Sequence, residues 1–156
     1  MTDGWSDERR EIAYAEARAV IEAQNATMTD VDDKALRTVR LNAILLGMLV
    51  TGLQFASDAF HTTTLQVAFA LLVISTVCGV ITYGESNLFV GPRGEYVEFL
   101  GTGDFPASAW EDHLLETMAG MIAENYEKLE RNATWLTATQ TALVLGIVAA
   151  AVAVAI

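Results

Sequence analysis

The hydrophobic and polar positions divide the chain into three long apolar stretches separated by polar segments. The apolar stretches cover residues 41–60, 65–83 and 135–156. Each is close to the ~20 residues that an α-helix needs to cross a hydrocarbon layer of ~30 Å. The pattern therefore predicts three transmembrane helices, and the first two form a tight hairpin around residues 58–64.

The polar segments also carry a helical pattern. Residues 6–26 place small and apolar side chains at positions i, i+4, i+7 and i+8, which predicts an amphipathic helix. Asp30 is expected to be the N-cap of a second helix that enters the first span. A capping box at Ser108 begins a further helical pattern, and neither a proline nor a glycine pair interrupts it before Trp135. That helix is expected to continue into the third span.

The segment between these helices is irregular, because glycines and prolines punctuate residues 84–107. Within it, residues 96–100 fit either one helical turn or a short strand. The predicted fold is all-α, with three transmembrane helices, an N-terminal amphipathic helix and a long cytoplasmic helix that continues into the third span. The corresponding segments are a cytoplasmic helical region (1–40), a transmembrane hairpin (41–83), a cytoplasmic loop and helix (84–132) and the third transmembrane helix (133–156).

The basic residues predict the orientation in the membrane. All nine Lys and Arg residues precede the first apolar stretch or lie between the second and the third, and residues 58–64 contain none. Positive segments stay on the cytoplasmic side, so the N-terminus is expected inside the cell and the C-terminus outside, in the cell membrane. Lys34, Arg37 and Arg40 lie three residues apart just before the first span, where we expect them to anchor the helix at the lipid headgroups.

Charge and composition narrow the class of protein further. The formal net charge is −11 although 53% of the residues are hydrophobic, and arginine greatly outnumbers lysine. This balance resembles that of acidic proteins from salt-in halophiles such as haloarchaea, in which molar salt shortens the Debye length to about 3 Å and screens the repulsion. Nucleic acid is not an expected partner, because no basic stripe is available to neutralise phosphates.

The residue types that carry catalysis are sparse. No Lys, Arg, Asp or Glu lies in the hydrophobic centre of a span, which disfavours a proton relay or an ion-coupled carrier. His61 and His113 are predicted on opposite sides of the membrane and cannot share a metal ion, and Cys78 is the only cysteine. We therefore expect a protein that is not an enzyme and that has no cofactor and no metal site.

Polar residues near the membrane are candidates for interaction instead. Asn125 and Asn132 lie seven residues apart on the apolar stripe of the long helix, where a buried asparagine can specify partner and register. Thr137 and Gln140 continue this polar trace, and they would line a weakly polar pore if several copies met there. The alternatives are boundary residues near the headgroups and hydrogen bonds between the three spans.

Small and polar residues inside the first two spans predict close contacts between helices, because they let backbones approach and supply hydrogen bonds that lipid cannot. These residues are Asn42, Thr51, Gln54, Ser75, Thr76, Gly47, Gly52 and Gly79. Arg93, in the turn Gly91–Gly94, is a candidate contact for a phosphate or carboxylate ligand. Its alternative role is an ion pair with a neighbouring glutamate.

Asp33-Lys34-Ala35, followed by Asn42 and the first span, resembles the entry of Pycsar-type transmembrane effectors, which act in nucleotide-signalled antiphage systems. The layout is also similar to that of small multi-span membrane proteins of haloarchaea. The first hypothesis is a non-enzymatic membrane protein that self-associates, or joins a membrane-protein partner, through its acidic cytoplasmic helices. The resemblance to the effectors implies the alternative, a ligand-gated membrane-disrupting protein or a small oligomeric channel.

Overall fold

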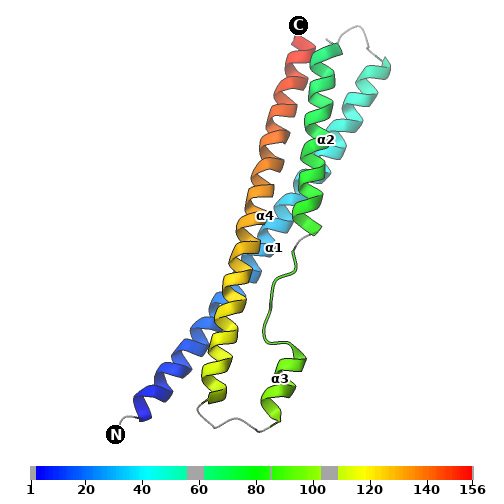
Figure 1. The fold of residues 1–156 in the computed structure, drawn as a ribbon. Helices are drawn as coiled ribbons and strands as arrows, with labels where there is room; N and C mark the ends of the chain where they lie inside the picture. The colour runs from blue at the N-terminus through cyan, green and yellow to red at the C-terminus, as the bar shows by residue number, and fades with distance from the viewer. Residues whose placement is uncertain (1–2, 56–61, 85, 103–108, 156) are drawn as a thin grey trace. The chain divides into compact units, whose positions relative to one another are not determined.

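The computed structural model describes residues 3–55, 62–84, 86–102 and 109–155, and it contains only helices and irregular segments within them (Figure 1). The helices are α1 (Asp3–Phe55), α2 (Thr62–Gly84), α3 (Gly94–Gly101) and α4 (Ala109–Ala155). The predicted all-α class is confirmed for these ranges. Residues 58–61 of the predicted hairpin turn (58–64) and the predicted capping box at Ser108 lie outside the described residues, whereas residues 62–64 belong to α2.

Helix α1 corrects one prediction. The sequence pattern placed one helix at residues 6–26 and began another at Asp30, whereas α1 runs without interruption from Asp3 to Phe55. Asp30 therefore lies in a helix interior and is not an N-cap. Met28 and Val31 are buried on the same side of α1, so packing across this point outweighs the local capping preference of Asp30.

Helix α3 resolves the alternatives for residues 96–100 in favour of a helix. Arg93 precedes it in an extended conformation, and the Arg93 carbonyl accepts the backbone N–H groups of Tyr96 at 2.9 Å and Val97 at 3.1 Å. The bond from Val97 is the first regular bond of the helix, and the bond from Tyr96 satisfies one of the four N–H groups that a helix start leaves without an intrahelical partner. Helix α4 continues from Ala109 to Ala155 without a break, as the absence of a breaking signal before Trp135 predicted.

The chain divides into two compact units, and each combines segments that are far apart in the sequence. The polar unit consists of Met1–Met28 and Asn87–Leu129, and it contains α3. The apolar unit consists of Thr29–Ser86 and Glu130–Ile156, and it contains α2. Helices α1 and α4 each contribute a part to both units.

The interior of the apolar unit follows a heptad pattern. Its main buried positions on α1 and α2 alternate by three and four residues, and on α4 the buried residues include a set that recurs every seven residues from Asn132 to Ala153. This spacing is the seam of a left-handed coiled coil, in which side chains of one helix fit between those of the next. On α2 the seam residues are Leu65, Ala68, Leu72, Ser75, Gly79 and Thr82.

Two glycines let the helices of the apolar unit approach closely. A Cβ atom built on Gly79 of α2 would lie 2.6 Å from Val39 Cγ2 of α1 and 3.3 Å from Thr139 Cγ2 of α4. A Cβ atom on Gly146 of α4 would lie 3.0 Å from Leu72 Cγ. Small residues at such contacts are typical of helices that pack within a membrane.

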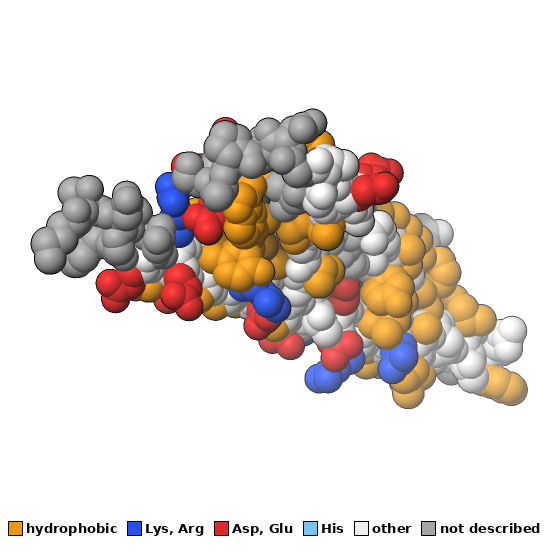
Figure 2. Space-filling view, turned by 90° about the horizontal axis from the view of Figure 1, so that it is seen from below, with side chains coloured by type: hydrophobic (Ala, Val, Ile, Leu, Met, Phe, Trp, Pro, Cys, Tyr) orange, Lys and Arg blue, Asp and Glu red, His pale blue; other side chains and the backbone are white. Residues whose placement is uncertain are grey.

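Three helices of the described chain are long and apolar enough to cross a membrane. They lie within Glu8–Phe55, Thr63–Gly84 and Trp110–Ala155. The outward side chains of α2 are large and apolar, as expected for contact with lipid; they include Val67, Phe69, Val73, Ile74, Val77 and Val80. Elsewhere on the molecule, hydrophobic patches lie between acidic and basic side chains, as the face in Figure 2 shows. The chain thus has the architecture of an integral membrane protein with a charged portion.

Candidate functional site

Asn125 is the anchor of the polar unit. It is fully buried on α4, and its carboxamide pairs with the backbone of Phe89 in the extended segment before α3. Asn125 Oδ1 accepts the Phe89 N–H at 2.8 Å, and Asn125 Nδ2 donates to the Phe89 carbonyl at 3.0 Å and to Gln24 Oε1 at 3.3 Å. Gln24 of α1 in turn donates to the Ile122 carbonyl at 2.9 Å. One side chain therefore joins α1, α4 and the extended segment.

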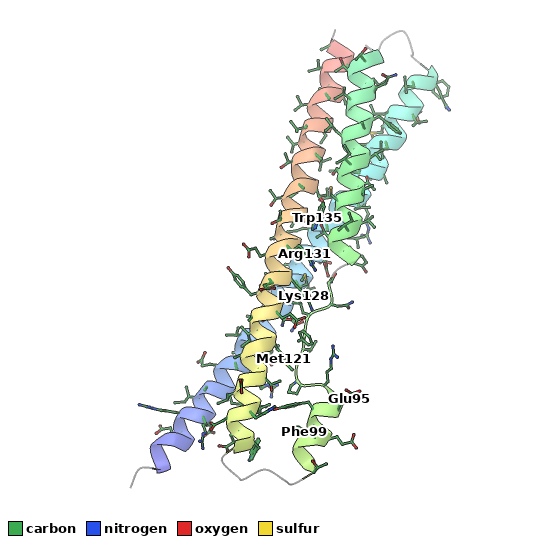
Figure 3. The ribbon with its side chains drawn as sticks, viewed as in Figure 1. Glu95, Phe99, Met121, Lys128, Arg131 and Trp135 are labelled. Atoms are coloured by element: carbon green, nitrogen blue, oxygen red, sulfur yellow. The ribbon has the colours of Figure 1, made fainter. Side chains whose placement is uncertain are left out.

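The ring of Phe89 lies beneath two cations. Lys128 Nζ is 4.6 Å and Arg93 Cζ is 5.5 Å from the ring centroid, which is cation–π geometry. Lys128, labelled on α4 in Figure 3, also donates to the Asn87 carbonyl at 3.1 Å and lies 3.3 Å from Glu124 Oε1. Arg93, the predicted ligand contact, is exposed and forms no ion pair with the described residues. Its role toward a ligand stays a prediction.

Aromatic contacts attach α3 to α4. The Tyr96 hydroxyl is 2.7 Å from His113 Nδ1, and the two rings stack with their centroids 5.5 Å apart. The Phe99 ring lies 6.0 Å from that of His113. The structure places His113 half-buried in this aromatic cluster, although two acidic residues precede it in the sequence. The described residues include no group of three His, Cys, Asp or Glu side chains that could hold a metal ion.

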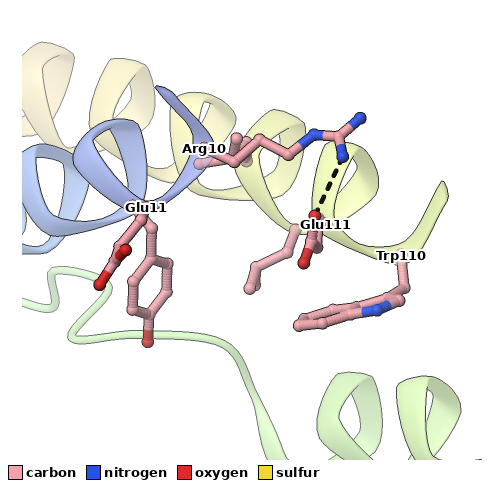
Figure 4. Close-up of a pocket in the computed structure, with 7 residues that line it drawn as sticks. Arg10, Glu11, Trp110 and Glu111 are labelled. Atoms are coloured by element: carbon pink, nitrogen blue, oxygen red, sulfur yellow. Dashed lines mark hydrogen bonds and ion pairs between the residues drawn. The ribbon is translucent and has the colours of Figure 1, made fainter. Parts of the chain in front are cut away.

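A cleft opens between residues 10–14 of α1 and residues 110–115 of α4, entirely within the polar unit. Its volume is about 590 Å³, and it is lined by Arg10, Glu11, Tyr14, Trp110, Glu111, Leu114 and Leu115 (Figure 4). On both helices the lining residues lie one helical turn apart, so each helix presents one continuous face. Arg10 reaches from α1 to α4, where Nη1 is 3.2 Å from Glu111 Oε2 and Nε is 3.2 Å from Asp112 Oδ1.

A chain of buried hydrogen bonds joins the three helices of the apolar unit. Asn42 Nδ2 of α1 donates to Ser75 Oγ of α2 at 2.8 Å, and Ser75 Oγ donates to the Thr139 carbonyl of α4 at 2.7 Å. A second contact joins Asn132 Nδ2 to the Thr82 carbonyl at 3.4 Å. Asn42 Oδ1 is buried and accepts no hydrogen bond within the described chain. Interhelical bonds of this kind contribute about 0.6–2 kcal/mol each in a membrane.

A polar stripe lies on the outside of α4 at the level of the apolar unit. We define it as Thr134, Thr137, Gln140 and Thr141, which are all exposed. Thr134 and Thr137 donate to carbonyls one turn earlier, at 3.0 Å and 2.8 Å, so their hydroxyl protons are used. The Gln140 carboxamide has no hydrogen-bond partner in the described part of the chain. A shallow groove of about 560 Å³ runs along the threonines of this stripe and is bordered by Leu71 of α2.

The predicted interaction residues do not share one face of α4. Asn125 and Asn132 are fully buried and have partners within their own chain, whereas Thr137 and Gln140 point outward. The continuous polar trace expected from the sequence is thus divided between an interior seam and the polar stripe. Only Thr137 and Gln140 remain available to a partner in this arrangement.

The three predicted membrane anchors lie on α1 as exposed side chains. The side chains of Lys34, Arg37 and Arg40 are all exposed, and Arg37 Nη2 is 3.7 Å from Asp33 Oδ2. Exposure is compatible with anchoring, which stays a prediction.

Sequence reasoning missed the cleft and the role of Thr139. Arg10 and Glu111 are about a hundred positions apart, so nothing local indicates that they meet. A signal for Thr139 was available, since Met118, Asn125, Asn132 and Thr139 recur every seven residues and all four are buried.

No protein-family model, no curated protein and no solved structure matches this chain. The fold and its surfaces define the class, an all-helical protein with three helices able to cross a membrane. Its function must be inferred from its own residues.

Proposed function

We propose that this chain is a non-enzymatic integral membrane protein that associates with copies of itself through the polar stripe of α4. The observation that carries the proposal is Gln140, an exposed carboxamide without a partner in the described chain, on a helix whose surroundings are apolar. A polar group left without a hydrogen bond in hydrocarbon costs several kcal/mol. Contact with another protein surface removes that cost.

A second copy of the chain suits this surface. A glutamine side chain both donates and accepts, so two symmetry-related Gln140 residues satisfy each other. The groove beside Gln140 is lined by small residues, among them Thr137, Ala138 and Thr141, which let another helix approach closely. The interior polar residues are unsuited to this role because Asn132 and Thr139 are buried in the chain's own helices.

The orientation is part of the same proposal. With the N-terminus in the cytoplasm, Lys34, Arg37 and Arg40 lie at the cytoplasmic headgroups and the polar unit lies in the cytoplasm. The acidic composition supports a cytoplasm of high salt, in which the repulsion between polar units of neighbouring copies is screened within about 3 Å. Association of copies is therefore expected to strengthen with salt.

The test is the molar mass of the purified protein in detergent at molar KCl, measured by light scattering with the detergent contribution subtracted. We expect a discrete oligomer that Gln140→Leu weakens by about tenfold, which corresponds to about 1.4 kcal/mol. Gln66→Leu is the matched control, because Gln66 is also exposed but lies on α2, away from the polar stripe. A wild-type protein that is monomeric at every concentration would overturn the proposal.

A second candidate function is a small oligomeric channel or membrane-disrupting effector. It is favoured by the position of the polar stripe along the third apolar stretch of the sequence. Three or more copies meeting along this stripe would surround a neutral lining of Thr137, Gln140 and Thr141. Release of a dye from vesicles that contain the purified protein distinguishes the two functions. Dye release that Gln140→Leu abolishes supports the channel, whereas an oligomer that leaves the vesicles sealed supports assembly alone.

A further inference from the structure

We infer that the cleft between residues 10–14 of α1 and residues 110–115 of α4 binds an organic cation, namely a quaternary ammonium group that carries an apolar or aromatic substituent. The inference concerns the polar unit alone and does not depend on association through the polar stripe. It is carried by four features of the cleft: its size, its aromatic rings, its excess of carboxylates and the pairing of its only guanidinium.

The size and the lining suit a small molecule. A volume of about 590 Å³ lies within the range of about 300–1,000 Å³ that is usual for ligand sites. Leu114 and Leu115 of α4 are half-buried and form an apolar part of the lining. Tyr14 and Trp110 contribute aromatic rings, and they are 40% and 38% exposed, so their surfaces remain accessible from solvent. An apolar substituent of the ligand has surface to cover here.

The charges favour a cation over an anion. Glu11 and Glu111 line the cleft and Asp112 adjoins it, whereas Arg10 is the only base among the described residues that line it. The Arg10 guanidinium already bonds to Glu111 and Asp112, both at 3.2 Å, so an anion would have to displace two carboxylates to reach it. Glu11 has no ion pair among the described residues, so its negative charge is uncompensated locally.

The aromatic rings select the kind of cation. The face of an indole or phenol ring attracts a positive charge within about 6 Å of its centroid, and tryptophan does so most strongly. A quaternary ammonium group has no N–H group that could donate a hydrogen bond to water, so it loses little hydration when it contacts such a ring. Potassium and lysine-type ammonium ions are more strongly hydrated and lose more. The combination of Trp110, Tyr14 and Glu11 is therefore suited to a quaternary ammonium group.

The experiment uses three ligands of nearly the same shape and different charge. Benzyltrimethylammonium is the cation, neopentylbenzene is its neutral counterpart and benzylsulfonate is the anion. Binding to the full-length protein in detergent is followed by the fluorescence of Trp110, after Trp5 and Trp135 have been replaced by phenylalanine. We expect saturable quenching by the cation only.

Substitutions then locate the site. Trp110→Leu and Tyr14→Leu keep an apolar side chain and remove the aromatic face, and equilibrium dialysis is expected to show binding weakened by about tenfold. Glu11→Gln is expected to weaken binding and to reduce its dependence on salt. Tyr126→Leu is the control, because Tyr126 is an exposed tyrosine of α4 that does not line the cleft.

The outcomes are distinct. Tighter binding of the anion, or binding of the neutral compound equal to that of the cation, overturns the inference. Equal losses for Tyr126→Leu and Trp110→Leu also overturn it, since binding would then not be at the cleft. Because the readout is ligand binding, a failure here leaves the molar-mass test of self-association unaffected.

Discussion

Asn42 of α1 donates a hydrogen bond to the Ser75 hydroxyl of α2 at 2.8 Å, and both side chains are fully buried in the apolar unit. The Ser75 hydroxyl in turn donates a hydrogen bond to the Thr139 carbonyl of α4. The Ser75 hydroxyl therefore accepts one hydrogen bond and donates another, and through these two bonds it links α1, α2 and α4.

Ser75→Ala is expected to destabilise the apolar unit by about 1–3 kcal/mol, because it leaves the buried Asn42 carboxamide without its partner. The double variant Asn42→Leu, Ser75→Ala is expected to be more stable than Ser75→Ala alone, because no buried polar group is then left unpaired. The measurement is loss of helical signal in a denaturant series in detergent. If the double variant is the less stable of the two, the hydrogen bond is not what holds this position.

Gly79→Ala is expected to destabilise the apolar unit by about 1–3 kcal/mol, since the added methyl must displace the Val39 side chain. Val39 is β-branched and has little freedom to rotate away. Gly47→Ala is the matched control: a Cβ atom there meets nothing within 4 Å. That variant is expected to be neutral or more stable by up to about 1 kcal/mol, because alanine is the better helix former. Thermal unfolding of both variants side by side tests the pair, and equal midpoints would contradict the close approach at Gly79.

Asn125→Leu is expected to release the extended segment from the polar unit. Phe89 loses the partner of its backbone N–H and one of the two donors to its carbonyl, although leucine keeps a side chain of similar size. The other donor to this carbonyl, Asn25 Nδ2 at 3.3 Å, remains. Hydrogen exchange at the Phe89 amide is the measurement, and a loss of about 1–3 kcal/mol corresponds to exchange about 5–150 times faster. The Tyr126→Leu variant should leave this amide unchanged. Unaltered exchange in Asn125→Leu would show that the Asn25 hydrogen bond and the cations over the Phe89 ring are sufficient to hold the segment.

The pKa of Asp32 on α1 is raised above its ordinary value of 3.8, chiefly because burial disfavours the charged carboxylate. The hydrogen bond from Ser86 lowers this pKa, and the negative charge of Asp33 raises it further. Ser86 Oγ is 2.9 Å from Asp32 Oδ1 and 2.6 Å from the Tyr83 carbonyl. One hydroxyl proton cannot serve both contacts at once, so Asp32 shares the Ser86 donor with the Tyr83 carbonyl.

The sign of the pH dependence follows from the raised pKa. The folded state holds this proton more tightly than the unfolded state, so stability falls as pH rises from about 3.8 through the folded pKa and then stays lower. Asp32→Asn is expected to raise stability at pH 7 and to flatten the dependence across this window. Denaturation between pH 4 and pH 8 checks this, with Asp30→Asn as control, because Asp30 is an exposed carboxylate of the same helix. An Asp32→Asn variant less stable than wild type at pH 7 would contradict it.

The sequence predicted the helical class and the three apolar spans because long hydrophobic runs with helical spacing leave few alternatives in a membrane. The predicted break at Asp30 was wrong because the burial of Met28 and Val31 is a property of neighbouring helices, which a local cap signal does not report. The pairing of Asn125 with Phe89 was not predictable, since it joins a helix to an irregular segment 36 positions away. The sequence could have predicted that Asn132 and Gln140 point in different directions, because eight residues along a helix rotate the side-chain direction by about a quarter turn.

The bond from Ser75 to Thr139 bears on how the chain assembles during synthesis. The first two spans enter the membrane before the third has been made, and at that stage Asn42 and Ser75 can already pair. The Ser75 proton, however, has its acceptor on a helix that arrives last. Before α4 is inserted, the hairpin of α1 and α2 therefore carries a Ser75 hydroxyl whose hydrogen-bond acceptor, the Thr139 carbonyl, is still missing. Insertion of α4 supplies the Thr139 carbonyl, and the completed pair of hydrogen bonds then aligns the three helices with one another at this level.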